Sequence, residues 1–87
     1  MSKAYRDFHF ARVRETVSHL GGNFPFWLEA AESADQPADY LAAMAETASC
    51  LIGNEFAAAS PQRLEELEEA ILVFRECCVA MEALEGA

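Results

Sequence analysis

The chain has 87 residues and a formal net charge of −9, from six Lys and Arg against fifteen Asp and Glu. This length predicts a single domain, residues 1–87, and no apolar run approaches the roughly 20 residues that cross a bilayer. We expect a cytoplasmic protein, because the N-terminus also lacks the apolar stretch of a signal peptide, and three cysteines do not resemble a secreted disulfide framework.

The charge is distributed unevenly along the chain. Residues 1–15 contain four basic and two acidic side chains, whereas residues 16–87 contain two basic and thirteen acidic ones. Direct binding to nucleic acid requires a basic face, which the acidic body does not offer. An acidic surface instead favours a basic partner protein.

The first predicted helix runs from about Lys3 to Leu20 and ends at Gly21-Gly22. Its inner stripe has spacings of 3, 4 and 3 residues, typical of one helix face, and consists of Phe10, Val13, Val17 and Leu20. The arginines that lie mainly off this stripe are expected to pair with the acidic body; they are Arg6, Arg12 and Arg14. Glu15 and His19 are four residues apart and are expected to lie on one face.

A dense aromatic segment follows, and Pro25 within it fits the start of a second helix of about two turns. Its aromatic residues are Phe24, Phe26 and Trp27. Two interpretations stay open. These side chains either fill one end of a helical bundle or form an exposed anchor for a partner protein.

The third predicted helix begins at Pro37 and extends to about Ile52, with an apolar face formed by Leu41, Met44, Ala48 and Leu51. The sequence Gly53-Asn54 is typical of a helix end, yet residues 55–59 (EFAAA) favour helix. The helix therefore either stops at Gly53 or continues with a kink.

The last predicted helix lies within Ser60–Ala87. Ser60 is suited to cap it, Pro61 to the first helical position, and Gly86 to its end. Its apolar seam consists of Leu64, Leu67, Ile71, Phe74, Cys78 and Met81, with Cys77 beside it. The predicted class is all-α: a small antiparallel bundle of three main helices and one short helix, with the last helix as its backbone.

The length of the last helix raises the question of what covers it. A compact domain of this size has a diameter of roughly 30 Å, whereas about 25 helical residues extend roughly 37 Å. The helix should therefore overhang a compact monomer, or the bundle must be elongated. A homodimer through this helix would cover an overhanging apolar seam.

Four glutamates near the start of this helix form an acidic ridge: Glu65, Glu66, Glu68 and Glu69. Three of them read E-E-x-x-E, which resembles the first acidic motif of the all-α nucleotide pyrophosphohydrolases, the MazG-like family. That resemblance implies glutamates holding Mg²⁺ at a triphosphate. The family's second motif, E-x-x-D, is absent, since Glu82 and Glu85 give only E-x-x-E.

Other catalytic and metal-binding patterns are also missing, because H-E-x-x-H, E-x-x-H and C-x-x-C do not occur, and His9 and His19 would lie roughly 15 Å apart on one helix. We therefore predict no catalytic residue, no metal and no cofactor.

The sequence thus favours a small acidic non-catalytic protein that binds, and inhibits or regulates, another protein with a basic surface. The predicted contacts are the anchors Phe24, Phe26 and Trp27 together with the acidic ridge. Three alternatives stay open: an inhibitor that mimics nucleic acid, similar in size and charge to some anti-CRISPR proteins; a Mg²⁺-dependent pyrophosphohydrolase; and a structural homodimer.

Overall fold

The computed structural model describes residues 3–86, which form four α-helices and no strand. The helices are α1 (Lys3–Leu20), α2 (Phe24–Ser33), α3 (Pro37–Glu55) and α4 (Pro61–Glu85). This confirms the all-α class, with three long helices and one short helix. None of the described helices is long and apolar enough to cross a membrane.

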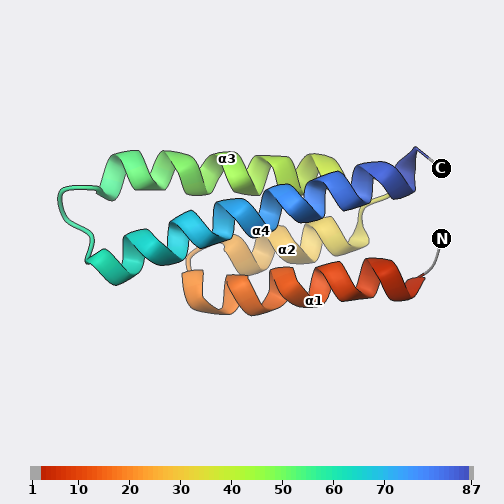
Figure 1. Ribbon diagram of the computed structural model, residues 1–87, viewed down its shortest axis with the longest axis horizontal. Coiled ribbons are helices and arrows are strands. Elements are labelled where there is room, and N and C mark those ends of the chain that lie inside the picture. Colours follow the sequence, from red (N-terminus) through yellow and green to blue (C-terminus); the bar gives the residue numbers. More distant parts are fainter. Residues whose placement is uncertain (1–2, 87) are drawn as a thin grey trace.

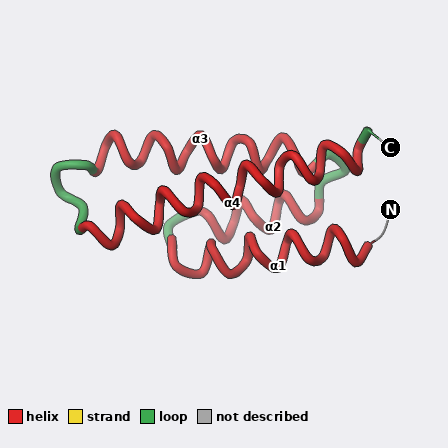
Figure 2. The backbone as a smooth tube through the Cα atoms, viewed as in Figure 1, coloured by secondary structure: helices red, strands yellow, loops and turns green. Residues whose placement is uncertain are grey.

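The four helices form a bundle in which the chain reverses direction at each connection (Figures 1 and 2). The long helix α4 packs most extensively against α3 and also packs against α1. The short helix α2 packs against α1 and α3, on the side of the bundle away from α4. The helices α2 and α4 therefore lie diagonally across the bundle.

Helix ends are set by the local signals that the sequence contains. Gly21 and Gly22 have φ values of 67° and 57°, a left-handed conformation that terminates α1 and that glycine adopts without steric cost. The Ser60 hydroxyl accepts a hydrogen bond from the Arg63 backbone N–H over 3.1 Å and so caps α4.

The helix α3 continues through Gly53 and Asn54 and ends at Glu55. Its last carbonyl, that of Glu55, accepts hydrogen bonds from the N–H groups of Ala58 and Ala59, over 2.9 and 2.7 Å. A turn over residues 56–59 then leads to α4. Of the two alternatives, continuation past Gly53 is thus correct, although residues 56–59 are not helical.

The core is entirely apolar, with no buried polar or charged side chain among the described residues. The predicted stripe of α1 is buried as a whole. In α4 the most buried positions differ from the predicted seam and are Leu67, Ala70, Phe74, Cys77, Ala80 and Met81.

The two adjacent cysteines of α4 exchange their predicted places. Cys77 is completely buried, whereas Cys78 is only half-buried at the α3 side, where its thiol lies 3.3 Å from the Ala38 carbonyl. The physical reason is that α4 packs against α1 as well as α3, which moves the centre of its buried face toward α1. The prediction that placed Cys78 on the core seam was therefore wrong by one position.

The bundle is elongated, with extents of 43 × 19 × 18 Å and a radius of gyration of 12.9 Å. The α3–α4 hairpin extends beyond the ends of α1 and α2, and Phe56 at its turn is 68% exposed (Figure 1). Since α3 accompanies α4 along this extension, no residue of the apolar seam of α4 is fully exposed, and Leu64, Ile71 and Cys78 are half-buried. The length of α4 therefore provides no argument for a homodimer.

Candidate functional site

Phe24, one of the three predicted anchors, belongs to the core. It is only 2% exposed, stacks on Phe74 of α4 at a centroid distance of 5.9 Å, and meets Trp27 edge-to-face at 5.1 Å. Because α2 docks with this position facing inward, Phe24 fills the bundle and presents no surface to a partner. Its prediction as a partner-binding residue is corrected accordingly.

The other two predicted anchors lie on the surface to different extents. Phe26 is 71% exposed, and Trp27 is half-buried. Trp27 lines a groove of about 340 Å³ between α2 and α3, together with Tyr40, Ala43, Met44 and Thr47. The aromatic segment thus fills part of the core through Phe24 and leaves Phe26 exposed on the surface.

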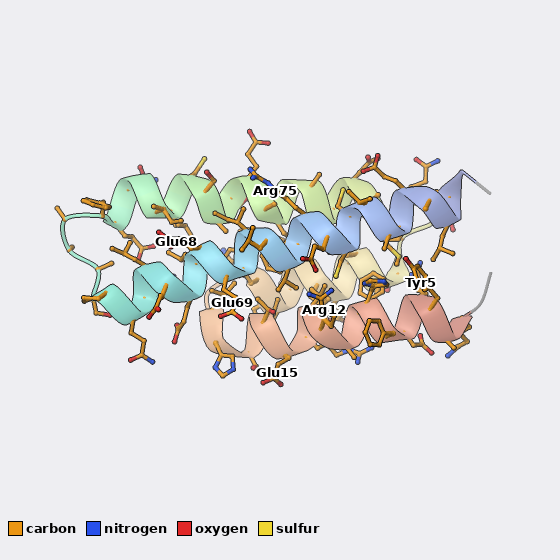
Figure 3. The ribbon with its side chains drawn as sticks, in the orientation of Figure 1. Tyr5, Arg12, Glu15, Glu68, Glu69 and Arg75 are labelled. Carbon is orange, nitrogen blue, oxygen red and sulfur yellow. The ribbon has the colours of Figure 1, made fainter. Side chains whose placement is uncertain are left out.

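The four glutamates of the predicted acidic ridge do not form one cluster. Glu66 and Glu69 line hollows between α4 and α1. Glu68 extends from the opposite edge of α4, toward α3, on the same side as Arg75 (Figure 3). Among residues 3–86, no three His, Cys, Asp or Glu side chains gather so that they could hold a metal ion. The geometry therefore gives no support to a magnesium site on these glutamates.

The aromatic anchors and the acidic ridge also lie on different helices that are diagonal in the bundle. Phe26 and Trp27 are on α2, and the ridge is on α4. A partner seated on one surface would have to reach around α1 or α3 to touch the other. The structure thus separates the two halves of the contact surface that the sequence suggested.

The surface between α1 and α4 contains a continuous groove, which we call the α1–α4 groove. One hollow of about 410 Å³ is lined by Phe8, Ala11, Arg12, Glu15, Thr16, Glu69 and Val73. A second hollow of about 180 Å³ is lined by Glu15, Thr16, His19, Glu66 and Glu69. The two share Glu15, Thr16 and Glu69, so they join end to end. The groove is apolar at the Phe8 end and acidic at the His19 end.

Arg12 and Arg14 of α1 form ion pairs with the acidic body, as the sequence predicted, whereas Arg6 contacts a backbone carbonyl instead. Arg12 Nη2 lies 2.7 Å from Glu76 Oε2, and Arg14 Nε lies 2.8 Å from Glu32 Oε1. Arg6 donates a hydrogen bond to the Glu32 carbonyl over 2.8 Å. These three arginines of α1 thus already have an acidic or carbonyl partner within the chain.

The carboxylates of the α1–α4 groove lack such cationic partners. Glu15 lies 3.5 Å from His19, an imidazole that carries charge only when protonated. Glu66 accepts a hydrogen bond from the neutral amide of Gln62. For Glu69 the described residues provide no hydrogen bond or ion pair. The groove therefore carries uncompensated negative charge.

Large apolar side chains are exposed on the two helices that form this groove. Among residues 3–86, seven large hydrophobic side chains are exposed, and four of them lie on α1 and α4: Tyr5, Phe8, Leu72 and Val79. Of these four, only Phe8 lines the groove. We call the groove, with Phe8 at its apolar end, the α1–α4 face. Sequence reasoning did not single out Leu72 and Val79, although they are seven residues apart and off the apolar seam. That regular spacing on the outer surface is the signal that could have found them.

A histidine and a cysteine lie beneath this face. Cys77 Sγ is 3.7 Å from His9 Nδ1, and the His9 ring meets Tyr5 edge-to-face. Burial raises the pKa of the Cys77 thiol; burial and the Arg12 charge lower the pKa of His9. Both shifts favour the neutral forms, and Cys77 is completely buried. The pair therefore packs α1 against α4 and does not resemble an activated thiolate.

Comparison of this chain with protein-family models, with curated proteins and with solved structures found no match.

Proposed function

We propose that this chain is a non-catalytic domain that binds another protein, which it inhibits or regulates, and that the α1–α4 face is its binding surface. The observation that carries the proposal is the exposure of Phe8, at 62%, at the apolar end of an open groove between α1 and α4. Exposed apolar surface combined with a groove on a folded domain is characteristic of protein contact surfaces.

The arrangement has the composition of an interface. Aromatic and aliphatic anchors contribute most of the free energy of typical interfaces, and a polar rim surrounds them. Here Phe8 and Val73 supply the apolar centre, and Glu15 and Glu69 supply charge at its edge. The charge would accelerate association with a basic partner and select it over acidic ones.

A pair of matched variants tests this proposal. Phe8→Ala and Phe26→Ala remove the same aromatic ring from residues of similar exposure, on α1 and α2 respectively. Tagged wild type and variants would be used to capture proteins from the native host, with identification by mass spectrometry. We expect Phe8→Ala to lose the wild-type partner and Phe26→Ala to retain it.

Other outcomes of the same experiment would contradict the proposed surface. Loss of the partner with Phe26→Ala alone would assign binding to the aromatic surface of α2 and α3. Capture of the same protein by all three forms would exclude Phe8 as an anchor. Folding of each variant would be verified by circular dichroism, so that lost binding is not lost structure.

A nucleic-acid mimic is the second candidate, favoured by the uncompensated carboxylates of Glu15, Glu66 and Glu69. Such an inhibitor would occupy a basic channel through charge rather than through apolar anchors. Its complex should dissociate at about 0.5 M salt, where screening shortens electrostatic interactions to a few ångströms. A complex that survives this salt concentration and depends on Phe8 would favour the α1–α4 face instead.

A further inference from the structure

We propose that the α1–α4 groove binds a basic amphipathic α-helix of a partner protein. This inference rests on the proposed function and specifies the chemistry of the partner. The groove lies between two antiparallel helices, and a third helix packs into such a surface in helical bundles and in helix-in-groove complexes (Figure 1).

The length of the groove fits a helical ligand. Its lining on α1 extends from Phe8 to His19, which is roughly 16 Å at the helical rise. About three turns of a docked helix span this distance, so two or three side chains from one face can enter the groove. Apolar side chains of the ligand would pack at Phe8, Ala11 and Val73.

The negative charge of the groove determines which side chains the ligand needs on either side of its apolar stripe. Glu69 extends from the edge of α4 that faces α1, and Glu15 lies on α1 (Figure 3). With Glu66 they supply three carboxylates that no Lys or Arg of the described chain neutralises, whereas Arg12 is already paired with Glu76. Lysines or arginines beside the apolar stripe of the ligand would meet these carboxylates.

A second copy of the same chain is a poor occupant. Each copy carries a net charge of −9, and the outer surface of α4 would bring further carboxylates toward the groove. These carboxylates include Glu65, Glu68 and Glu82. Among the described residues of this surface, Arg75 is a cation without an ion pair. Carboxylates brought together in the groove would repel each other, so charge complementarity favours a basic chain as the ligand of the groove.

The test uses three fluorescein-labelled model peptides of about 18 residues, a length of roughly 27 Å as a helix. The first is a Leu/Lys/Ala amphipathic helix with leucines at helical spacing. The second has the same composition in a scrambled order without an apolar face, and the third has glutamate in place of every lysine. Affinity is measured by fluorescence anisotropy with the full chain.

We expect the basic amphipathic helix to bind at least about tenfold more tightly than the scrambled peptide, because only the former places leucines in the groove. The acidic peptide should not bind. Phe8→Ala should weaken binding by about tenfold, and Phe26→Ala by less than about twofold. Equal affinity for the two basic peptides, or no effect of Phe8→Ala, would overturn the proposal.

Charge is tested with two triple variants that change the net charge equally. The groove variant is Glu15→Gln, Glu66→Gln and Glu69→Gln. The control neutralises three exposed carboxylates elsewhere, through Glu29→Gln, Asp35→Asn and Glu46→Gln. We expect the groove variant to lose about tenfold in affinity and most of the salt dependence, and the control to lose less than about threefold. Equal losses would show non-specific attraction and overturn the proposal.

Two results separate this inference from the proposed function. If the model helix fails to bind but Phe8 is still required to capture the host protein, the helical basic ligand is wrong and the binding surface stands. If light scattering shows a dimer that Phe8→Ala converts to a monomer, a second copy occupies the groove and the inference is overturned.

Discussion

The guanidinium of Arg63, in the first turn of α4, donates a hydrogen bond to the carbonyl of Leu20, the last residue of α1, over 2.9 Å. The Nε atom of the same side chain lies 3.4 Å from Glu55 Oε1, at the end of α3. The carbonyls of a last helical turn have no partner within the helix, and the dipole makes that end negative. Arg63 therefore joins the start of α4 to the ends of α1 and α3, and its positive charge has the favourable sign for those two C-terminal ends.

We expect Arg63→Ala to lower the free energy of unfolding by about 1–2 kcal/mol, because the substitution removes a charge-assisted hydrogen bond from a partly buried carbonyl. Arg75→Ala is the matched control. Arg75 is exposed and has no hydrogen bond or ion pair with a described residue, so its loss should change stability by less than about 0.5 kcal/mol. Urea denaturation measures both, and equal effects would contradict the role assigned to Arg63.

Gly53 lies inside α3 with a helical conformation, and a methyl group added there would meet no atom within 4 Å. We expect Gly53→Ala to raise the free energy of unfolding by about 0.5–1 kcal/mol, since alanine loses less backbone entropy on forming a helix. Gly21→Ala is the opposite case: space is also open there, but its φ of +67° is unfavourable for alanine. It should destabilise by about 1 kcal/mol. Thermal denaturation measures both, and two changes of the same sign would contradict the backbone roles assigned to these glycines.

The two phenylalanines of α2 should differ strongly in their contribution to stability. Phe24→Ala leaves a cavity against Phe74 and should cost about 3–5 kcal/mol. Phe26→Ala removes a ring that is 71% exposed and should cost less than about 0.5 kcal/mol. Chemical denaturation followed by circular dichroism checks both. A loss of more than about 2 kcal/mol for Phe26→Ala would show that its ring is packed.

The environment of His9 predicts how stability changes with pH. Burial and the Arg12 charge lower the pKa of His9 below its ordinary value of 6.5, while Glu76 partly opposes this shift. As the pH falls below about 6.5, the unfolded chain therefore takes up a proton before the folded chain does, and stability decreases. We expect His9→Gln to reduce the stability lost between about pH 7 and about pH 5.

Nuclear magnetic resonance measures the pKa of His9 directly. The His9 ring protons of the wild type should titrate with a midpoint below 6.5, with His19→Gln used to assign the resonances. A midpoint above this value would contradict the shift. So would an unchanged pH dependence of stability in His9→Gln.

The three cysteines should differ in reactivity toward an aromatic disulfide reagent at about pH 8. Cys50 is exposed and should react at once, whereas Cys77 is completely buried. Burial, the hydrogen bond to Glu82, and the charges of Glu82, Glu85 and Asp39 raise the pKa of Cys78 to about 11, so little thiolate forms. One thiol per chain should react rapidly, and Cys50→Ser should abolish that phase. A rapid phase that survives in Cys50→Ser would contradict this assignment.

The helices of this protein follow from local signals in its sequence. The spacing of Phe10, Val13 and Val17 defines the inner face of α1. Gly21 ends α1 and Ser60 caps the start of α4, and each acts on residues next to it in the sequence. Such signals depend on residues that are close in sequence, so the helix starts and the all-α class could be predicted without knowing the neighbours.

Which side chains share a surface depends instead on how the helices pack. Phe24 faces inward and Phe26 outward because of where α2 docks, and Cys77 rather than Cys78 is buried because α4 packs against two helices. The α1–α4 groove joins Phe8 to Val73, which are far apart in the sequence. The spacing of residues along one helix does not determine how two helices are positioned relative to each other. The groove could therefore be found only from the packed bundle.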